Sequence, residues 1–221
     1  MGVSYNPKIV TNGLVLALDA ANVKSYPGSG NNWIDISTAG KTGALISSPV
    51  YNANNSGSFI FNGVNYVSVA GSNTVTEATF IVWMKRSGTQ QAYAGLIYSR
   101  VSFTGLDFDI NGLNLGYNWN NNANAYNFAS NLSPPDGTWC MCALSVSPTS
   151  ATFYLCQSSG IRTATNTTSH ASITISTVLV AQEISFRPFT GNISVAQMYT
   201  RALSAAEVSQ NFNALRGRYG I

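Results

Sequence analysis

The chain has 221 residues, of which 45% are hydrophobic and only 9% are charged, and its formal net charge is +3. This length allows one large or two small domains with a sizeable apolar core. The basic residues are scattered, which argues against nucleic-acid binding, and no apolar run approaches the ~20 residues that a membrane-spanning helix needs. With so few charges, the surface has to be covered by Asn, Ser, Thr and Gly.

The predicted elements are mostly short strands separated by turn residues. After an irregular arm, residues 1–12, the strand at 13–19 is apolar on both faces, which is typical of a strand covered on both sides. In the apolar stretch at 58–69, the dipeptide Asn62-Gly63 predicts a tight hairpin or a bulge. Further strands are predicted at 78–85, 95–100, 106–110, 113–119, 138–146, 151–156, 172–180 and 193–199. So many short strands predict a β-sandwich or barrel rather than alternating strands and helices.

One short helix is predicted after the last strand. Ser204 and Glu207 form an S-x-x-E capping box, which fixes where the helix begins. Gly217 is expected to end it. The apolar face of the helix is expected to consist of Val208, Phe212 and Leu215.

The three cysteines, Cys140, Cys142 and Cys156, lie in one predicted hairpin. A turn at Pro148 would place Cys156 opposite Cys142, so a cross-strand disulfide is conceivable. The odd count favours buried thiols instead. A zinc site is not expected, because C-x-C is too tight for the usual spacing and His170 is the only histidine.

An Asn-rich segment at 111–127 is the candidate glycan-binding site. Aromatic rings can lie under sugar rings, and Asn side chains can pair with hydroxyls. The alternative is an ordinary Asn-rich hairpin loop, since Asn tolerates the left-handed conformation. The candidate residues are Tyr117, Trp119, Asn120 and Tyr126.

Catalysis is not expected. Retaining glycosidases use two carboxylates ~5–5.5 Å apart, and of the eight acidic residues only Asp107 and Asp109 are spaced i, i+2 on a probable strand. A calcium ion needs six to eight oxygen ligands, and Asp107, Asp109 and Asp35 do not make such a set. Asp19 and Asp35 are better explained as turn-forming residues. We therefore expect no metal and no other cofactor.

The motifs along the chain resemble those of the laminin-G-like branch of the concanavalin A-like jelly rolls. The resemblance spans residues 13–221 and implies an all-β, antiparallel β-sandwich jelly roll with one short C-terminal helix. It also implies a division into an N-terminal arm, residues 1–12, and a single domain, residues 13–221. The motifs are Gly13-Leu-Val-Leu-Ala-Leu-Asp19, Trp33-Ile-Asp35, Ser58-Phe-Ile-Phe-Asn-Gly63, Phe80-Ile-Val-Trp-Met-Lys85, Gly137-Thr-Trp139, Phe189-Thr-Gly-Asn-Ile-Ser194 and Tyr199-Thr-Arg-Ala-Leu-Ser-Ala-Ala-Glu207.

The closing segment, residues 210–221, resembles stand-alone domains of this type from tailed bacteriophages of marine and cyanobacterial hosts. The resemblance implies a non-enzymatic virion structural protein on a capsid, tail or fibre, with other virion subunits or further copies of itself as partners. The arm is the candidate docking segment. The alternative is a lectin-like module for glycans on the host surface. The first eight residues lack the pattern of a signal peptide, so we expect a protein made in the host cytoplasm and located in the virion.

Overall fold

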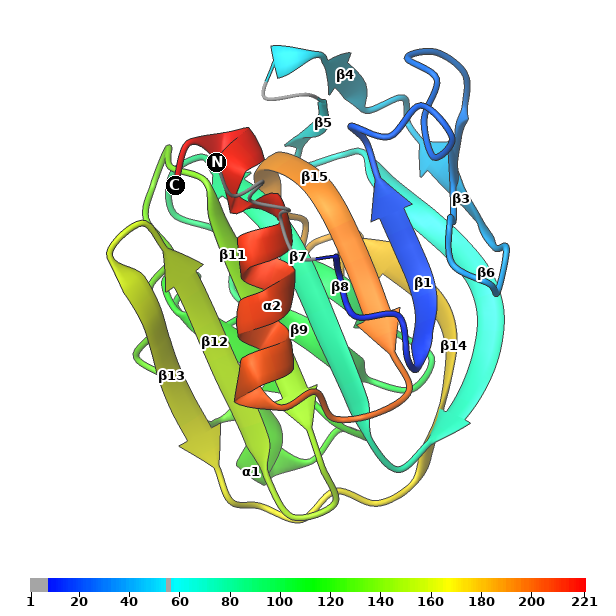
Figure 1. Ribbon diagram of the computed structural model, residues 1–221. Coiled ribbons are helices and arrows are strands. Elements are labelled where there is room, and N and C mark those ends of the chain that lie inside the picture. The colour runs from blue at the N-terminus through cyan, green and yellow to red at the C-terminus, as the bar shows by residue number, and fades with distance from the viewer. Residues whose placement is uncertain (1–7, 55–56) are drawn as a thin grey trace, which may run out of the picture.

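Two antiparallel sheets packed face to face make up the computed structural model, which describes residues 8–54 and 57–221 (Figure 1). Sheet 1 has eight strands in this part of the chain. Their order is β13 (Gly160–Asn166), β12 (Ala151–Gln157), β11 (Cys140–Val146), β7 (Ala78–Arg86), β15 (Thr190–Tyr199), β5 (Ser58–Asn62) and β4 (Val50–Asn52), with β1 (Leu14–Asp19) also paired to β15.

Sheet 2 has seven strands among the same residues. Their order is β10 (Leu115–Asn118), β9 (Thr104–Phe108), β8 (Gly95–Ser99), β14 (Ile173–Val180), β6 (Tyr66–Val75), β3 (Thr42–Ile46) and β2 (Asn32–Ile34). Two α-helices are present in the described residues, α1 (Ala123–Tyr126) and α2 (Ala205–Leu215). The predicted all-β sandwich with one short C-terminal helix is confirmed, and α1 adds a single helical turn.

Alternate residues of the strands fill the space between the sheets. On β7, Phe80, Val82 and Met84 face this core, whereas Ile81 and Trp83 belong to a second apolar cluster on the other side of sheet 1. Because successive side chains of a strand point to opposite faces, sheet 1 is covered on both sides. The prediction that the first strand is buried on both faces is confirmed for β1.

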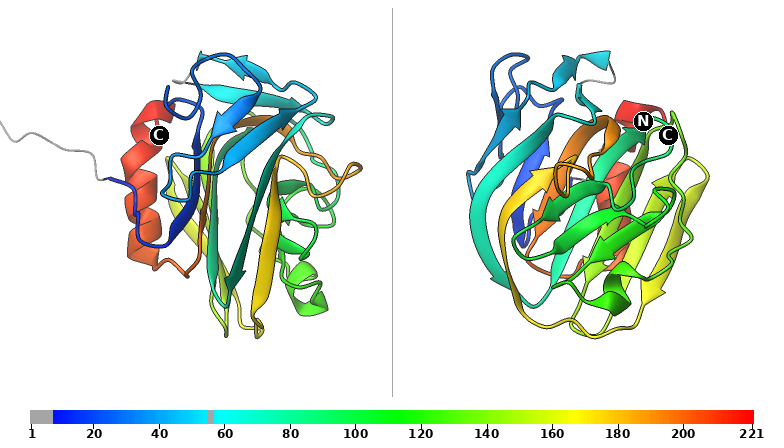
Figure 2. Two further views of the ribbon diagram at one scale, coloured as in Figure 1. Left: turned by 90° about the vertical axis from the view of Figure 1, so that its right-hand side faces the viewer. Right: turned by 180° about the vertical axis from the view of Figure 1, so that it is seen from behind.

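Helix α2 covers the outer face of sheet 1 (Figure 1; left view of Figure 2). Trp83 of β7 stacks on Phe212 of the helix with 5.6 Å between ring centroids. It also stacks at 4.4 Å on Tyr219, in the 3₁₀ turn Arg216–Tyr219 that continues the helix. None of the helices in the described residues has the length and apolar character that crossing a membrane would require.

The start of α2 follows the predicted capping box. The Ser204 hydroxyl accepts the Glu207 backbone N–H at 3.3 Å, and the Glu207 carboxylate accepts the Ser204 N–H at 2.9 Å. Gly217 lies at the predicted C′ position, because α2 ends at Leu215 with Arg216 as its C-cap, but it does not stop the chain, which passes directly into the 3₁₀ turn. The left-handed residue that stops it is Gly220, with φ 69°.

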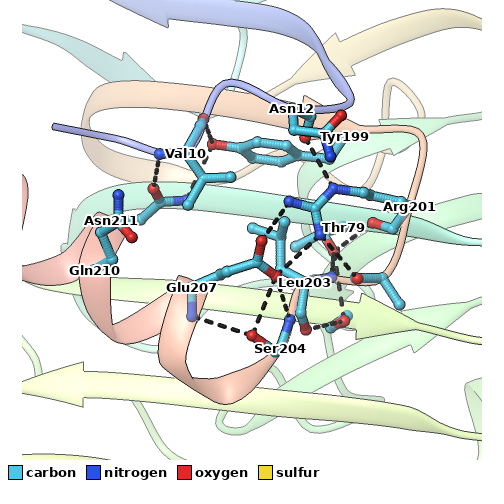
Figure 3. Close-up of polar contacts among 12 residues, drawn as sticks. Val10, Asn12, Thr79, Tyr199, Arg201, Leu203, Ser204, Glu207, Gln210 and Asn211 are labelled. Carbon is cyan, nitrogen blue, oxygen red and sulfur yellow. Dashed lines mark hydrogen bonds and ion pairs between the residues drawn. The ribbon is translucent and has the colours of Figure 1, made fainter.

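The segment before β1 packs on α2 (Figure 3). Asn211 of the helix accepts the Val10 N–H at 2.7 Å, and the Tyr199 hydroxyl donates to the Val10 carbonyl at 2.9 Å. Arg201 donates to the Asn12 carbonyl at 2.9 Å. Within the predicted arm, residues 1–7 lie outside the described residues, and residues 8–12 dock on their own domain rather than standing free.

Asn62-Gly63 is neither a tight hairpin nor a bulge. The strand before it, β5, lies in sheet 1 and the strand after it, β6, lies in sheet 2. The turn therefore carries the chain from one sheet to the other. The dipeptide indicates a change of direction, but it does not determine which strand the next one pairs with.

The cysteines are free and buried, as expected. Cys140 and Cys142 face the core between the sheets, and their sulfur atoms are 3.8 Å apart. The suggested pairing of Cys156 with Cys142 is wrong by one residue, because Cys156 lies opposite Met141. A shift of one residue turns a side chain to the other face, so Cys156 points toward α2.

The ion pair at the helix start predicts a dependence of stability on pH. Hydrogen bonds from Arg201 and from the Ser204 backbone lower the pKa of Glu207 from 4.5 to about 2. The stabilising contribution of the ionised Glu207 should be complete above pH 4.5 and disappear as the pH falls to about 2. We expect Glu207→Gln to lower the free energy of unfolding by roughly 1 kcal/mol at neutral pH.

Urea unfolding of both proteins across this pH range measures the effect. The difference between wild type and Glu207→Gln should shrink toward pH 2 and vanish there. In an Arg201→Gln background the difference should be smaller and should vanish at a higher pH, because the first cause of the lowered pKa of Glu207 is gone. A constant difference at every pH would contradict this account of the cap.

Candidate functional site

A pocket of about 210 Å³ opens on the outer face of sheet 2, over β8, β9 and β10. Loop residues 181–189 form part of its wall, and in the left view of Figure 2 this loop (orange) projects on the side away from α2. The lining side chains are Tyr93, Tyr98, Arg100, Phe103, Asp107, Asn118, Asn121, Tyr126, Glu183 and Arg187. Aromatic, polar and charged side chains therefore surround a small hollow.

The floor of the pocket comes from the alternation of the strands. Asp107 lies between Leu106 and Phe108, which both face the core, so Asp107 points outward. By the same alternation Asn118 points outward from β10, between Tyr117 and Trp119. Asp107 is 2% exposed and Tyr98 is fully buried. These polar groups are thus held on a rigid sheet.

The residues opposite the polar side chains of the floor are glycines, which have no side chain to fill the pocket. Gly105 lies opposite both Tyr98 and Asn118, and Gly116 lies opposite Asp107. A Cβ atom at Gly105 would be 2.3 Å from the Ile97 carbonyl oxygen, and the φ of +151° is one that L side chains rarely adopt. At Gly95 a Cβ atom would be 2.3 Å from the Glu183 nitrogen. The close approach of the wall loop to β8 therefore requires glycine.

Two arginines and one glutamate form the wall. Arg100 and Arg187 each donate from Nη1 to a different oxygen of Glu183, at 2.7 and 2.6 Å. Each guanidinium also lies over an aromatic ring, Arg100 over Phe103 at 4.3 Å and Arg187 over Tyr93 at 4.6 Å. The Glu183 side chain is 2% exposed. This arrangement fixes the planes of both guanidinium groups before any ligand arrives.

Three buried polar atoms of the floor make no hydrogen bond of normal geometry to a described residue, although the Asn118 side chain is close enough to Tyr98 to affect the pKa of its hydroxyl. They are Tyr98 Oη, Asp107 Oδ1 and Asn118 Oδ1. Burial, and then the nearby Glu183, raise the pKa of Asp107 well above its usual range. A buried polar group without a partner typically costs about 1–3 kcal/mol. Three of them gathered at one hollow are a sign of a binding site.

Comparison with known families identifies the fold. A model of the concanavalin A-like lectin/glucanases superfamily, of the laminin-G type, matches residues 61–209. The chain belongs to this superfamily. The comparison with curated proteins gave no match.

Solved structures share the fold at low sequence identity. Domain 4 of AbnA, a GH43 extracellular arabinanase from Geobacillus stearothermophilus solved with arabinotriose, is 14% identical, with TM-score 0.65 over 93% of this chain and 100% of that chain. The ligand-binding domain of botulinum neurotoxin serotype D, solved with N-acetylneuraminic acid, is 12% identical, with TM-score 0.66 over 94% and 52%. Trypanosoma rangeli sialidase in complex with the inhibitor DANA is 14% identical, with TM-score 0.64 over 96% and 35%. At these identities the likeness shows a lectin-like fold.

The predicted glycan residues of this lectin-like domain fall on two faces. Tyr126 lines the pocket, and Asn120 is exposed beside it with φ 54°. The prediction for Tyr117 and Trp119 is wrong, because both are 1% exposed and face the core. The Tyr117 hydroxyl lies 3.0 Å from His170 Nε2, and Trp119 Nε1 donates to the Ala171 carbonyl at 2.8 Å. Their polar ends are used in structural hydrogen bonds.

The acidic residues are almost all used by the fold. Asp35 accepts backbone N–H groups from Ala17, Ser37 and Lys41, and Asp19 accepts the Ala21 N–H and pairs with Arg218. These contacts bear out the turn-forming role. Asp109 is bound to backbone N–H groups of its own turn. Within the described residues no three His, Cys, Asp or Glu side chains gather as a metal site would need.

Several residues that line the pocket could not be predicted from the sequence, because they come from segments far apart in the chain. Arg100 and Glu183 are 83 positions apart, and no local pattern joins them. A signal was present for Asp107, an acid between two core residues of a strand. Burial of such a carboxyl group lowers the stability of the fold, so its presence indicates a function.

The glycine floor leads to a test of local strain. We expect Gly105→Ala to lower the free energy of unfolding by roughly 2–4 kcal/mol, because the methyl group would overlap the Ile97 carbonyl. Gly217→Ala is the control, since a Cβ atom there meets nothing within 4 Å. Urea denaturation should place the control within about 0.5 kcal/mol of wild type. Equal stability of Gly105→Ala and wild type would show that the floor tolerates side chains.

Proposed function

We propose that this chain is a carbohydrate-binding module and that the pocket over β8, β9 and β10 is its sugar site. One observation carries the proposal: Tyr98, Asp107 and Asn118 present buried polar atoms without partners to the same hollow. Buried polar groups in proteins are normally hydrogen-bonded. A ligand rich in hydroxyl groups would supply the missing partners.

The shape and the walls of the pocket fit a sugar ring. Its volume of about 210 Å³ is below the ~300–1,000 Å³ of sites for drug-sized ligands, so a single ring-sized group fills it. Tyr93, Phe103 and Tyr126 offer aromatic faces to the apolar side of such a ring. The lectin-like fold and the sugars bound in the arabinanase domain and neurotoxin domain structures support the same conclusion.

The proposed role is binding rather than hydrolysis. Asp107 and Glu183 are the only carboxyl groups that line the pocket in the described residues. Both oxygens of Glu183 are held by arginines, so Glu183 is a poor nucleophile or base. The paired, independent carboxyl groups of a glycosidase are therefore lacking in this pocket.

The Tyr98 hydroxyl supplies a test that separates binding from folding. In Tyr98→Phe only the unpartnered hydroxyl is removed, so the free energy of unfolding without ligand should stay equal or rise by up to about 1 kcal/mol. Affinity for the sugar should fall about two- to tenfold, because one hydrogen bond to the ligand is lost. A glycan array identifies the ligand, and calorimetry then compares the variants.

Tyr66→Phe is the matched control, since Tyr66 lies on β6 of the same sheet outside the pocket. It should bind the sugar as wild type does. A wild-type protein that binds no glycan on the array would end the proposal. Unchanged affinity in Tyr98→Phe would show that the sugar does not bind in this pocket.

Display on a bacteriophage particle is a second proposal. It rests on the resemblance of the closing segment and on one spatial fact, that residues 8–12 lie on α2, across the sandwich from the pocket. Attachment through that side would leave the pocket facing outward. Mass spectrometry of purified particles from an infected host tests this location, and absence of the protein from the particles would refute it.

A further inference from the structure

We propose that the sugar bound in the pocket is acidic and that its carboxylate lies between Arg100 and Arg187. This inference rests on the proposed function and adds the chemical class of the ligand. It depends on the free donors of the two arginines, on the charge balance of the lining and on the polar floor beneath.

Both arginines keep unused donors. Each gives one Nη1–H to Glu183, and neither guanidinium makes any other hydrogen bond within the described residues. Arg100 and Arg187 side chains are 38% and 31% exposed, so their remaining N–H groups are accessible. A guanidinium has five donors in a rigid fork that matches a carboxylate. Glu183 therefore orients the two arginines and leaves most of their N–H donors free.

The charges of the lining leave one positive charge unbalanced. Two arginines face one ionised carboxylate, Glu183, whose oxygens are both occupied. Asp107 makes no ion pair and no hydrogen bond to another described residue, and an ionised carboxylate in such a buried position would be very costly. We therefore treat Asp107 as a neutral acid. Asp109, two residues on, is held by the N–H groups of its own turn.

The floor complements this arrangement. A neutral Asp107 donates one hydrogen bond, Asn118 Oδ1 accepts one, and the Tyr98 hydroxyl can do either. These groups suit the hydroxyl groups and ring oxygen of a sugar. The carboxylate of the same sugar would then meet the arginines at the wall. The single unbalanced positive charge matches one carboxylate per ligand.

Paired glycans test the charge of the ligand directly. The probes are oligosaccharides that contain glucuronic, galacturonic or N-acetylneuraminic acid. Each is compared with the same oligosaccharide after reduction of its carboxyl group to the alcohol, and with sulfated glycans that have no carboxyl group. Wild type should bind at least one acidic glycan about tenfold more tightly than its reduced partner. This preference should weaken as salt concentration rises, because the guanidinium groups are partly exposed.

Variants of the arginines assign the effect to the pocket. Arg100→Gln should remove most of the preference for the acidic glycan, and Arg187→Lys, which keeps the charge but lacks the fork, should lower it about tenfold. Arg162→Gln is the control, because Arg162 is an exposed arginine of the edge strand β13. Thermal unfolding confirms that each variant is folded before it is compared.

The possible results are distinct. Equal or tighter binding of the reduced glycans would overturn the inference and leave the proposed function intact. Binding of sulfated but not carboxylated glycans would overturn it as well. If both arginine variants kept the preference for the acidic glycan, the carboxylate would not bind in this pocket. Failure to bind any glycan would refute the proposed function itself.

Discussion

The pairing of β15 inside sheet 1 is the constraint on which the rest of the structure depends. This strand pairs with β7 along one side and with β5 and β1 on the other, so residues 195–199 meet the first strand of the chain. The loop that leads into β15 provides Glu183 and Arg187 to the pocket, and the turn that leaves it provides the capped start of α2. One strand therefore positions both the candidate binding site and the helix-covered side. Because its contacts are so distant in sequence, we expect the chain to fold slowly compared with helical proteins.

The chain has few acidic residues, and nearly every one of them makes a specific structural contact. Asp19, Glu183 and Glu207 are paired with arginines. The carboxylates of Asp35, Glu77, Asp109 and Asp136 accept backbone N–H groups. Asp107 is the one acid of the described chain with neither kind of partner, and it lies at the floor of the pocket. Asp107 is informative because every other acidic residue is paired with an arginine or accepts a backbone N–H group.

The features that the sequence predicted are those fixed by local chemistry. The capping box of Ser204 and Glu207 and the buried strands could be recognised because they depend on residues within one turn or one strand. The sequence around Tyr117 and Trp119 predicts a glycan site, because aromatic rings beside Asn resemble one. The spacing of these two residues with Leu115 follows the alternation of β10, with Trp119 directly after its last residue, and places all three on the face that the core covers. The pocket itself joins residues from 93 to 187, and they meet only because β8, β9 and β10 pair side by side and the loop between β14 and β15 lies against them.

The unpartnered groups of the floor are better explained by a small ligand than by a protein partner. A specific protein interface is usually a broad surface of about 800 Å² on each side. The unpartnered polar atoms instead lie below the surface, at the floor of a small hollow of about 210 Å³. A protein side chain could enter it, but it would have to supply donors and acceptors to Tyr98, Asp107 and Asn118 at once. A sugar ring carries several hydroxyl groups in one rigid frame, so it can satisfy such a set with little loss of conformational entropy. The stability that the fold forgoes at this floor is therefore consistent with a site kept for binding, as stability and function commonly oppose one another in proteins.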